Sequence, residues 1–195
     1  MWSVYLYYLK ISILTITNKS LVYKDGYMSN NILFNDNFLE TCKKTTLKTF
    51  ENKINNQHIY QLLDNMPTSE QLALPTANQC CMPSPIGADA SLISIAIWSK
   101  IKCYPDNLPW KFEATAWGPG IGGGGAAGFM YTIYECWDML FDETAGYHAQ
   151  GVAEGGGIFQ ITWFTKNALP IGQFNGFLAG IGVFEVGGSG HWTCR

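Results

Sequence analysis

The spacing of apolar residues changes near residue 90, from a helical period to a period of two. The segment NFLETCKKTTLKTFENKINNQHIYQLLDNM, residues 37–66, is polar and carries apolar side chains three or four positions apart: Phe38, Leu39, Leu47, Phe50, Ile54, Ile59, Leu62 and Leu63. This spacing predicts one or two amphipathic helices. Four prolines at positions 67, 75, 83 and 85 then predict a linker.

From residue 91 onward, short alternating segments predict β-strands. In SLISIAIWSKIKC, Leu92, Ser94 and Ala96 alternate with isoleucines. Eight such segments are separated by Gly, Pro, Asn or Asp: residues 91–103, 110–118, 128–134, 146–155, 157–164, 170–180, 181–188 and 188–194. Because no long helix interrupts them, a parallel βαβ sheet is excluded. ECWDMLFDET, residues 135–144, predicts a single helical turn that caps or crosses the strands.

These patterns divide the chain into three regions. Residues 1–27 are apolar, but Lys10 interrupts the run and no small-x-small cleavage site follows, so they fit neither a signal peptide nor a spanning helix. Met28 is an alternative first residue, which would make residues 1–27 not native. Residues 28–90 are a helix-prone or disordered polar region with the proline-rich linker. Residues 91–195 are predicted to form a compact eight-stranded antiparallel β-barrel with one short helix.

The stretch WGPGIGGGGAAG, residues 117–128, contains the spacing G-x-G-x-x-G as Gly118, Gly120 and Gly123. A dinucleotide loop requires a helix after the glycines, so that the pyrophosphate meets the helix N-terminus. The following GGAAGFMYTIY is a poor helix former, and no Gly-Lys-Ser or Gly-Lys-Thr of a Walker loop follows the glycines. We therefore expect no nucleotide site, and interpret the glycines as a sharp bend at a barrel corner.

Charge is scarce and unevenly distributed. Charged residues make up 14% of the chain and the net charge is −3, which does not favour a nucleic-acid partner. Residues 1–112 carry ten Lys against eight acids, whereas residues 113–195 carry one Lys and one Arg against seven acids. This low charge suits a tightly closed β structure or a protein that meets apolar partners.

The residues that could support chemistry do not form a recognisable site. The histidines lie on separate predicted elements: His58, His148 and His191. None has the short spacing of metal ligands, and the acids of the predicted helical turn, Asp138, Asp142 and Glu143, are expected to be surface carboxylates. The cysteines contain no C-x-x-C and are expected to be buried or free thiols: Cys42, Cys80, Cys81, Cys103, Cys136 and Cys194.

Nucleophilic catalysis has only weak candidates. The possible thiol–imidazole pairs are Cys136 with His148 and Cys194 with His191, but nothing in the sequence positions either pair, and Ser189 looks like a turn residue. We therefore assign no catalytic, cofactor-binding or metal-binding residue and expect no cofactor. Gln160 and Gln173 alternate with apolar residues, so they face either water or the lumen of the barrel.

The C-terminal residues resemble a known family. The run GGGIFQITWFTKNALPIGQFNGFLAGIGVFEVGGSGHW, residues 155–192, is similar to the end of the bacterial virulence-associated protein (Vap) family, and WGPGIGGGGAAGFMYT and WDMLFDET are similar in kind. The resemblance implies a compact eight-stranded antiparallel barrel with one short helix after a variable N-terminal segment. It also implies a secreted protein that acts on host cells and supports survival inside phagocytes, with no known catalytic residues or cofactor.

Three functions follow from these observations. The first is a non-enzymatic, Vap-like effector whose barrel surface engages a host membrane or a host protein. The second is a small-ligand barrel of the lipocalin or avidin kind, which requires an open lumen lined by polar groups such as Gln160, Tyr131 or His148. The third is an enzyme resembling dirigent or allene oxide cyclase barrels, which requires a pocket with converging acids. A filled interior favours the first function.

Overall fold

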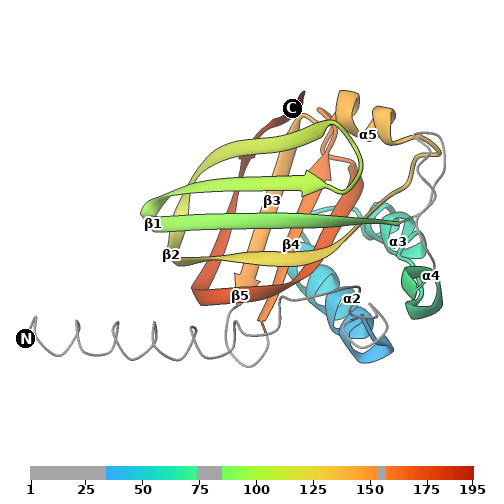
Figure 1. Ribbon diagram of the computed structural model, residues 1–195, viewed down its shortest axis with the longest axis horizontal. Coiled ribbons are helices and arrows are strands. Elements are labelled where there is room, and N and C mark those ends of the chain that lie inside the picture. The colour runs from blue at the N-terminus through green and yellow to red at the C-terminus, as the bar shows by residue number, and fades with distance from the viewer. Residues whose placement is uncertain (1–33, 74–84, 153–156) are drawn as a thin grey trace, which may run out of the picture. The chain divides into compact units, whose positions relative to one another are not determined.

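The computed structural model describes residues 34–73, 85–152 and 157–195. The apolar segment 1–27, Cys80, Cys81 and the glycines at 155 and 156 lie outside the described residues. The helices and strands occur in the following order: α2 (Asp36–Phe50), α3 (Asn56–Asp64), α4 (Ser69–Ala73), β1 (Ile86–Pro105), β2 (Trp110–Thr132), α5 (Trp137–Glu143), β3 (Gly146–Val152), β4 (Gly157–Phe164), β5 (Pro170–Ser189) and β6 (His191–Cys194) (Figure 1). The expected mainly β class is confirmed.

The strands form one antiparallel sheet that curls into a nearly closed barrel (Figure 1). β1 pairs with β2 along most of its length, and the second half of β2 pairs with β5. The first half of β5 then pairs with β4 and its second half with β3, while β3 and β4 pair with each other. β6 pairs with the start of β2, so the C-terminal end of the chain lies beside residues 110–113.

The described part of the chain has six strands instead of the predicted eight, because two pairs of predicted segments are continuous. Segment 110–118 and the first five residues of segment 128–134 belong to β2, and segments 170–180 and 181–188 both belong to β5. The glycines between them bend these strands without ending them. Gly122 and Gly182 face each other with φ of 139° and 106°, values that other residues rarely adopt. The expected bend at 117–128 is therefore present inside a strand.

The interior of the barrel is filled with apolar side chains. Phe112, Phe159, Trp163 and Phe174 are all fully buried in one core cluster. Phe159 meets Phe174 with ring centroids 5.9 Å apart, and Phe112 meets Trp163 at 5.8 Å. Large, interlocking aromatic rings are what a compact barrel of this size needs to exclude water.

The expected helices are present, with differences at the linker. Asn35 caps α2 by accepting a hydrogen bond from the backbone N–H of Phe38 at 3.0 Å. α4 lies inside the segment predicted to be a linker, and β1 begins at Ile86, five residues before the predicted boundary. The start of β1 was not predicted because its core-facing residues Ala88 and Ala90 are small, so the alternation of apolar and polar residues in IGADA is weak. α5 confirms the helical turn.

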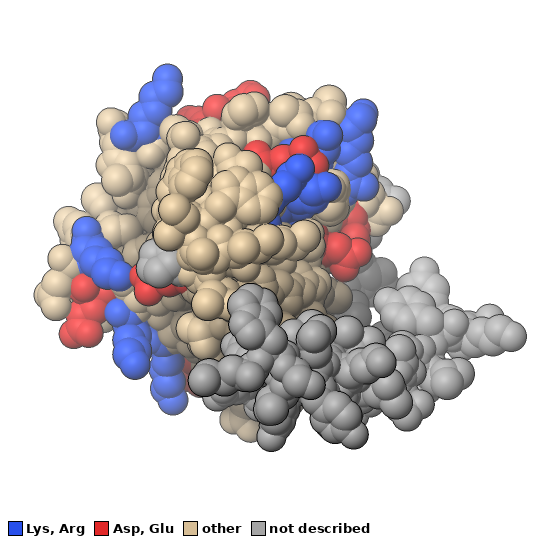
Figure 2. Space-filling view, turned by 90° about the vertical axis from the view of Figure 1, so that its left-hand side faces the viewer, with Lys and Arg blue, Asp and Glu red and all other residues tan. Residues whose placement is uncertain are grey.

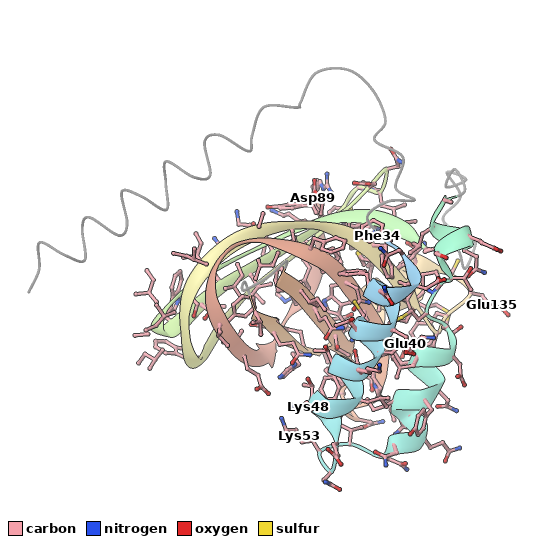
Figure 3. All side chains as sticks on the ribbon, turned by 90° about the horizontal axis from the view of Figure 1, so that it is seen from below. Phe34, Glu40, Lys48, Lys53, Asp89 and Glu135 are labelled. Carbon is pink, nitrogen blue, oxygen red and sulfur yellow. The ribbon has the colours of Figure 1, made fainter. Side chains whose placement is uncertain are left out.

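Helix α2 lies along the outer face of the barrel, as Figure 3 shows. Along β4, Phe159, Ile161 and Trp163 point into the barrel core, so Ile158 and Gln160 point outward, because successive side chains of a strand alternate. A second cluster, separate from the barrel core, joins α2 and α3 to outward residues of β2, β4 and β5. The helix-prone region is thus packed onto the barrel.

Candidate functional site

The structure does not bring the candidate metal ligands together. In the described ranges, no group of three or more His, Cys, Asp or Glu side chains is placed to hold a metal ion. Asp138, Asp142 and Glu143 are exposed on α5, as expected, and Glu143 accepts a hydrogen bond from Tyr134 at 2.7 Å.

The structure separates the residues of one thiol–imidazole pair and gives the histidine of the other a carboxylate partner. His148 bonds the carboxylate of Glu185 through Nε2 at 3.1 Å. Cys194 and His191 are three positions apart on strand β6, so they lie about 10 Å apart along the strand and point to opposite faces. Cys42 and Cys103 are buried, and burial raises the pKa of the Cys42 thiol to about 12. A thiol with so high a pKa is a poor nucleophile at neutral pH.

Gln160, Gln173 and Tyr131 do not line a lumen. They lie on the outer face of the barrel, buried beneath α2, in one hydrogen-bonded network with Asn175 and Thr46. The Gln160 amide donates to Asn175 Oδ1 at 2.7 Å, and the Tyr131 hydroxyl donates to Gln173 Oε1 at 2.7 Å. The placement required by the small-ligand barrel is therefore wrong for these residues, because α2 covers the face on which they lie.

A pocket of about 340 Å³ lies at the edge of α2, outside the barrel. Thr41 and Thr45 of α2 form one wall, and residues of β3, β4 and β5, including Gln150 and Glu185, form the other. This volume suits a small molecule, but its position differs from the lumen that the ligand-binding alternative requires.

The most distinctive surface of the described residues is apolar and lies where β1, β2 and β5 bend. We call it the crest, and its members are exposed large apolar side chains: Ile93, Ile95, Ile97, Trp98, Trp117, Ile121, Ile181 and Val183. The bends of β1 and β2 lie at the left-hand edge of the barrel in Figure 1. The sequence analysis assigned no binding residues and did not predict the crest. The one sequence feature that pointed to it is the row of alternating isoleucines in SLISIAIW.

Strand register brings these side chains into one surface. Ile95 pairs with Ile121, and Ile121 pairs with Val183, so one row crosses all three strands. Their exposed fractions are 65%, 76% and 58%. Trp98 and Trp117 pair at the next level. Side chains directly opposite one another on paired strands lie close enough to act together.

The local backbone fixes the crest in place. β1 bends at Ala96, which has a φ of 57°, and its register with β2 shifts between Ala96 and Trp98. Within the bend, the hydroxyl of Ser99 donates to that of Ser94 at 2.7 Å, and both are buried. The crest therefore projects from a bend in the sheet that the Ser99–Ser94 hydrogen bond stabilises on its buried side.

Charged residues are missing from the bends and lie around their margin. The sequence has no Asp, Glu, Lys or Arg in 90–99, 114–134 or 167–184. Figure 2 shows an uncharged area near the centre of this face with charged side chains around it. Beside the tryptophan pair, Lys100, Lys102 and Lys111 surround the single acid Glu113, whose pKa they hold below its usual value, the hydrogen bond from Lys102 most strongly.

None of the described helices is long and apolar enough to cross a bilayer.

Comparison with known proteins places the chain in a family. No curated protein matches it. Among solved structures, the virulence-associated protein VapB of Rhodococcus equi is 23% identical, with a TM-score of 0.49 over 57% of this chain and 98% of VapB. VapD of the same organism is 16% identical, with a TM-score of 0.49 over 56% of this chain and 97% of VapD. The model of the Rhodococcus equi virulence-associated protein family matches residues 27–193, and the chain belongs to this family.

Proposed function

We propose that this Vap-family protein is a secreted, non-enzymatic effector that acts on host cells by engaging a host membrane through the crest. The observation that carries the proposal is the crest itself: eight large apolar side chains, contributed by three strands, on a surface without charge. A contiguous exposed apolar patch on a folded protein marks an interaction site.

The crest offers enough apolar surface for reversible attachment. Ile93, Ile95, Ile97 and Ile121 are 57–76% exposed, and full burial of such a side chain is worth about 1.5–3 kcal/mol. Each isoleucine that enters lipid therefore contributes about 1–2 kcal/mol. Loss of translational and rotational freedom on binding removes a large part of that sum. The balance favours peripheral, reversible binding.

The margin of the crest favours lipid over protein as the partner. Trp98 and Trp117 stand side by side at its edge, and tryptophan is suited to the interface between hydrocarbon and water because one end of its ring system is polar. Next to them, three lysines and Glu113 leave a net charge of +2. Such a basic margin complements the negative surface of anionic lipids.

Vesicle flotation tests this function. The full chain is mixed with vesicles of phosphatidylcholine containing 30% phosphatidylserine, and the bound fraction is measured against the double variant I95S/I121S. We expect that variant to lose at least tenfold in bound fraction. Met139→Ser is the matched control, because Met139 is an exposed apolar residue, 45% accessible, on α5 outside the crest.

Two outcomes would overturn the proposal. If the wild-type chain does not float with vesicles, the crest is not a lipid-binding surface. A host protein is then the alternative partner to test. If I95S/I121S and M139S float equally well, binding occurs elsewhere on the molecule.

A further inference from the structure

The contact between α2 and the barrel is polar at its centre. Thr46, fully buried on α2, bonds Gln160 at 3.1 Å and Gln173 at 3.0 Å. The Gln160 amide also donates to the backbone carbonyl of Cys42 at 3.0 Å, and Thr49 donates to Gln150 at 2.6 Å. Exchanging such hydrogen bonds for bonds to water costs little net free energy, which is typical of contacts that form and break.

The outward side chains under α2 form a continuous polar surface. Gln150, Gln160 and Asn175 are direct neighbours across β3, β4 and β5, and Thr162 and Gln173 are neighbours in the next row. A sheet face that is permanently covered by a helix is usually apolar, because polar groups gain nothing from burial there. The glutamine, asparagine and threonine side chains of this face are instead typical of a sheet face that is exposed to water for part of the time.

The two ends of α2 are held differently. At the N-terminal end, Phe38 stacks on Phe177 with ring centroids 4.0 Å apart, and Phe34 meets Phe129 at 5.4 Å. Figure 3 places Phe34 and Lys53 at opposite ends of α2. Apolar stacking holds the first end at any pH.

At the C-terminal end, ionisable groups add to an apolar contact. Phe50 packs edge-on against Phe164, with ring centroids 5.6 Å apart, and against the imidazole of His148 at 5.2 Å. One oxygen of Glu185 accepts from Lys53 Nζ at 3.2 Å and from His148 Nε2 at 3.1 Å. Neutral His148 completes a cluster of one cation and one anion. A proton added to His148 would strengthen its bond to Glu185, but it would also place a charge on an imidazole that is largely buried against Phe50 and lies near Lys53.

The barrel does not need α2 for its own core. The barrel core cluster contains residues of the strands and α5 and none of α2, α3 or α4. Lifting α2 would uncover the second cluster and leave the first intact.

We propose that α2 is an acid-sensitive cover: protonation of His148 releases its stretch from Cys42 to Phe50 and bares the Gln150–Gln160–Asn175 face, while the Phe34–Phe38 end stays docked. The inference does not depend on membrane binding by the crest.

The direction of the pH effect follows from the groups around His148. In the described residues, the charged groups that face it are Glu185 from β5 and Lys53 after α2. Burial lowers the pKa of His148 below its usual value despite the bond to Glu185. A histidine with a lowered pKa in the docked state stabilises docking above its free pKa and loses that contribution as pH falls. Glu185, whose pKa is lowered chiefly by Lys53, changes docking in the same direction at still lower pH.

Cysteine labelling tests the cover. Cys42 faces the barrel under α2 and Cys103 lies in the barrel core, and both are fully buried. The full chain is treated with 4,4′-dithiodipyridine at pH 7.5 and pH 5.0, and modification at each cysteine is followed by peptide mass spectrometry. Rates are divided by those of the urea-unfolded chain at the same pH.

We expect the normalised rate at Cys42 to rise at least twofold on acidification, because the pKa of His148 is lower in the docked state. The rate at Cys103 stays constant. In His148→Gln the rate at Cys42 is the same at both pH values, whereas the exposed-histidine control His191→Gln behaves like wild type. His148→Phe, which keeps a ring against Phe50, gives a second non-titrating variant if the glutamine variant folds poorly.

Three results would overturn the cover. The first is an unchanged rate at Cys42, and the second is a parallel rise at Cys103, which indicates global unfolding. The third is an undiminished rise at Cys42 in both His148 variants.

Discussion

The paired bend glycines give the sharpest test of the fold. In Gly182→Ala, the new methyl group would collide with the carbonyl oxygen of Ile121 on the neighbouring strand. The φ of 106° at Gly182 is also unfavourable for alanine. Backbone strain of this kind costs about 1–3 kcal/mol, and forcing a paired strand aside costs a similar amount.

We therefore expect Gly182→Ala to lower the free energy of unfolding by about 2–5 kcal/mol. Gly125→Ala, in the glycine-rich bend of the paired strand β2, is the matched control. Its methyl group would meet only the carbonyl oxygen of Ala90, at 3.9 Å, and its φ is ordinary. That change should leave stability within about 1 kcal/mol of wild type, since losing a glycine also restricts the unfolded chain.

Urea unfolding, followed by tryptophan fluorescence, measures both variants. The midpoint of Gly182→Ala should fall at unchanged m-value, which identifies a loss of stability alone. If both variants unfold within 0.5 kcal/mol of each other (roughly the error of such extrapolations), then the bend does not require glycine at position 182, and the account of a strand kept continuous by Gly122 and Gly182 is refuted.

Three further substitutions probe other parts of the structure. Phe159→Ala, which empties a fully buried ring site in the barrel core, should cost about 3–5 kcal/mol in urea unfolding, and a cost below 1 kcal/mol would contradict the filled interior. Gln160→Ala removes the hydrogen bonds that the Gln160 amide donates to Asn175, Thr46 and the Cys42 carbonyl under α2, and should cost about 1–3 kcal/mol and raise labelling of Cys42 at neutral pH. Asn35→Ala removes the N-cap of α2 and should cost about 1 kcal/mol, seen as faster amide exchange in its first turn; unchanged exchange there would show that the cap does not matter.

Sequence reasoning recovered the classes of structure and several of their positions. The change of period near residue 90 predicted helices before strands, because the spacing of apolar residues reflects which side of an element is buried. The glycine-rich stretch was correctly interpreted as a bend, since β-branched and aromatic residues follow it where a nucleotide loop needs a helix. The helical turn was predicted from ECWDMLFDET and is present as α5, with Trp137, Leu140 and Phe141 buried.

Sequence reasoning was less successful where one residue type permits two outcomes. Glycine both ends strands and bends them, so β2 and β5 were each divided in two. The alternation around Gln160 and Gln173 showed that they lie opposite Phe159 and Phe174. It did not show that the polar side would be outward and covered, because that depends on α2, more than 100 residues earlier in the chain.

By itself, then, the sequence determined the local alternatives: which segments are helical, which are extended, and where the strands must bend. Only the tertiary structure decided which side chains share a surface. The crest forms because register sets Ile95 beside Ile121 and Ile121 beside Val183, although these residues are up to 88 positions apart. The physical reason is that hydrogen-bond register between distant strands is fixed by packing of the whole barrel, whereas propensity and periodicity act only over neighbouring residues.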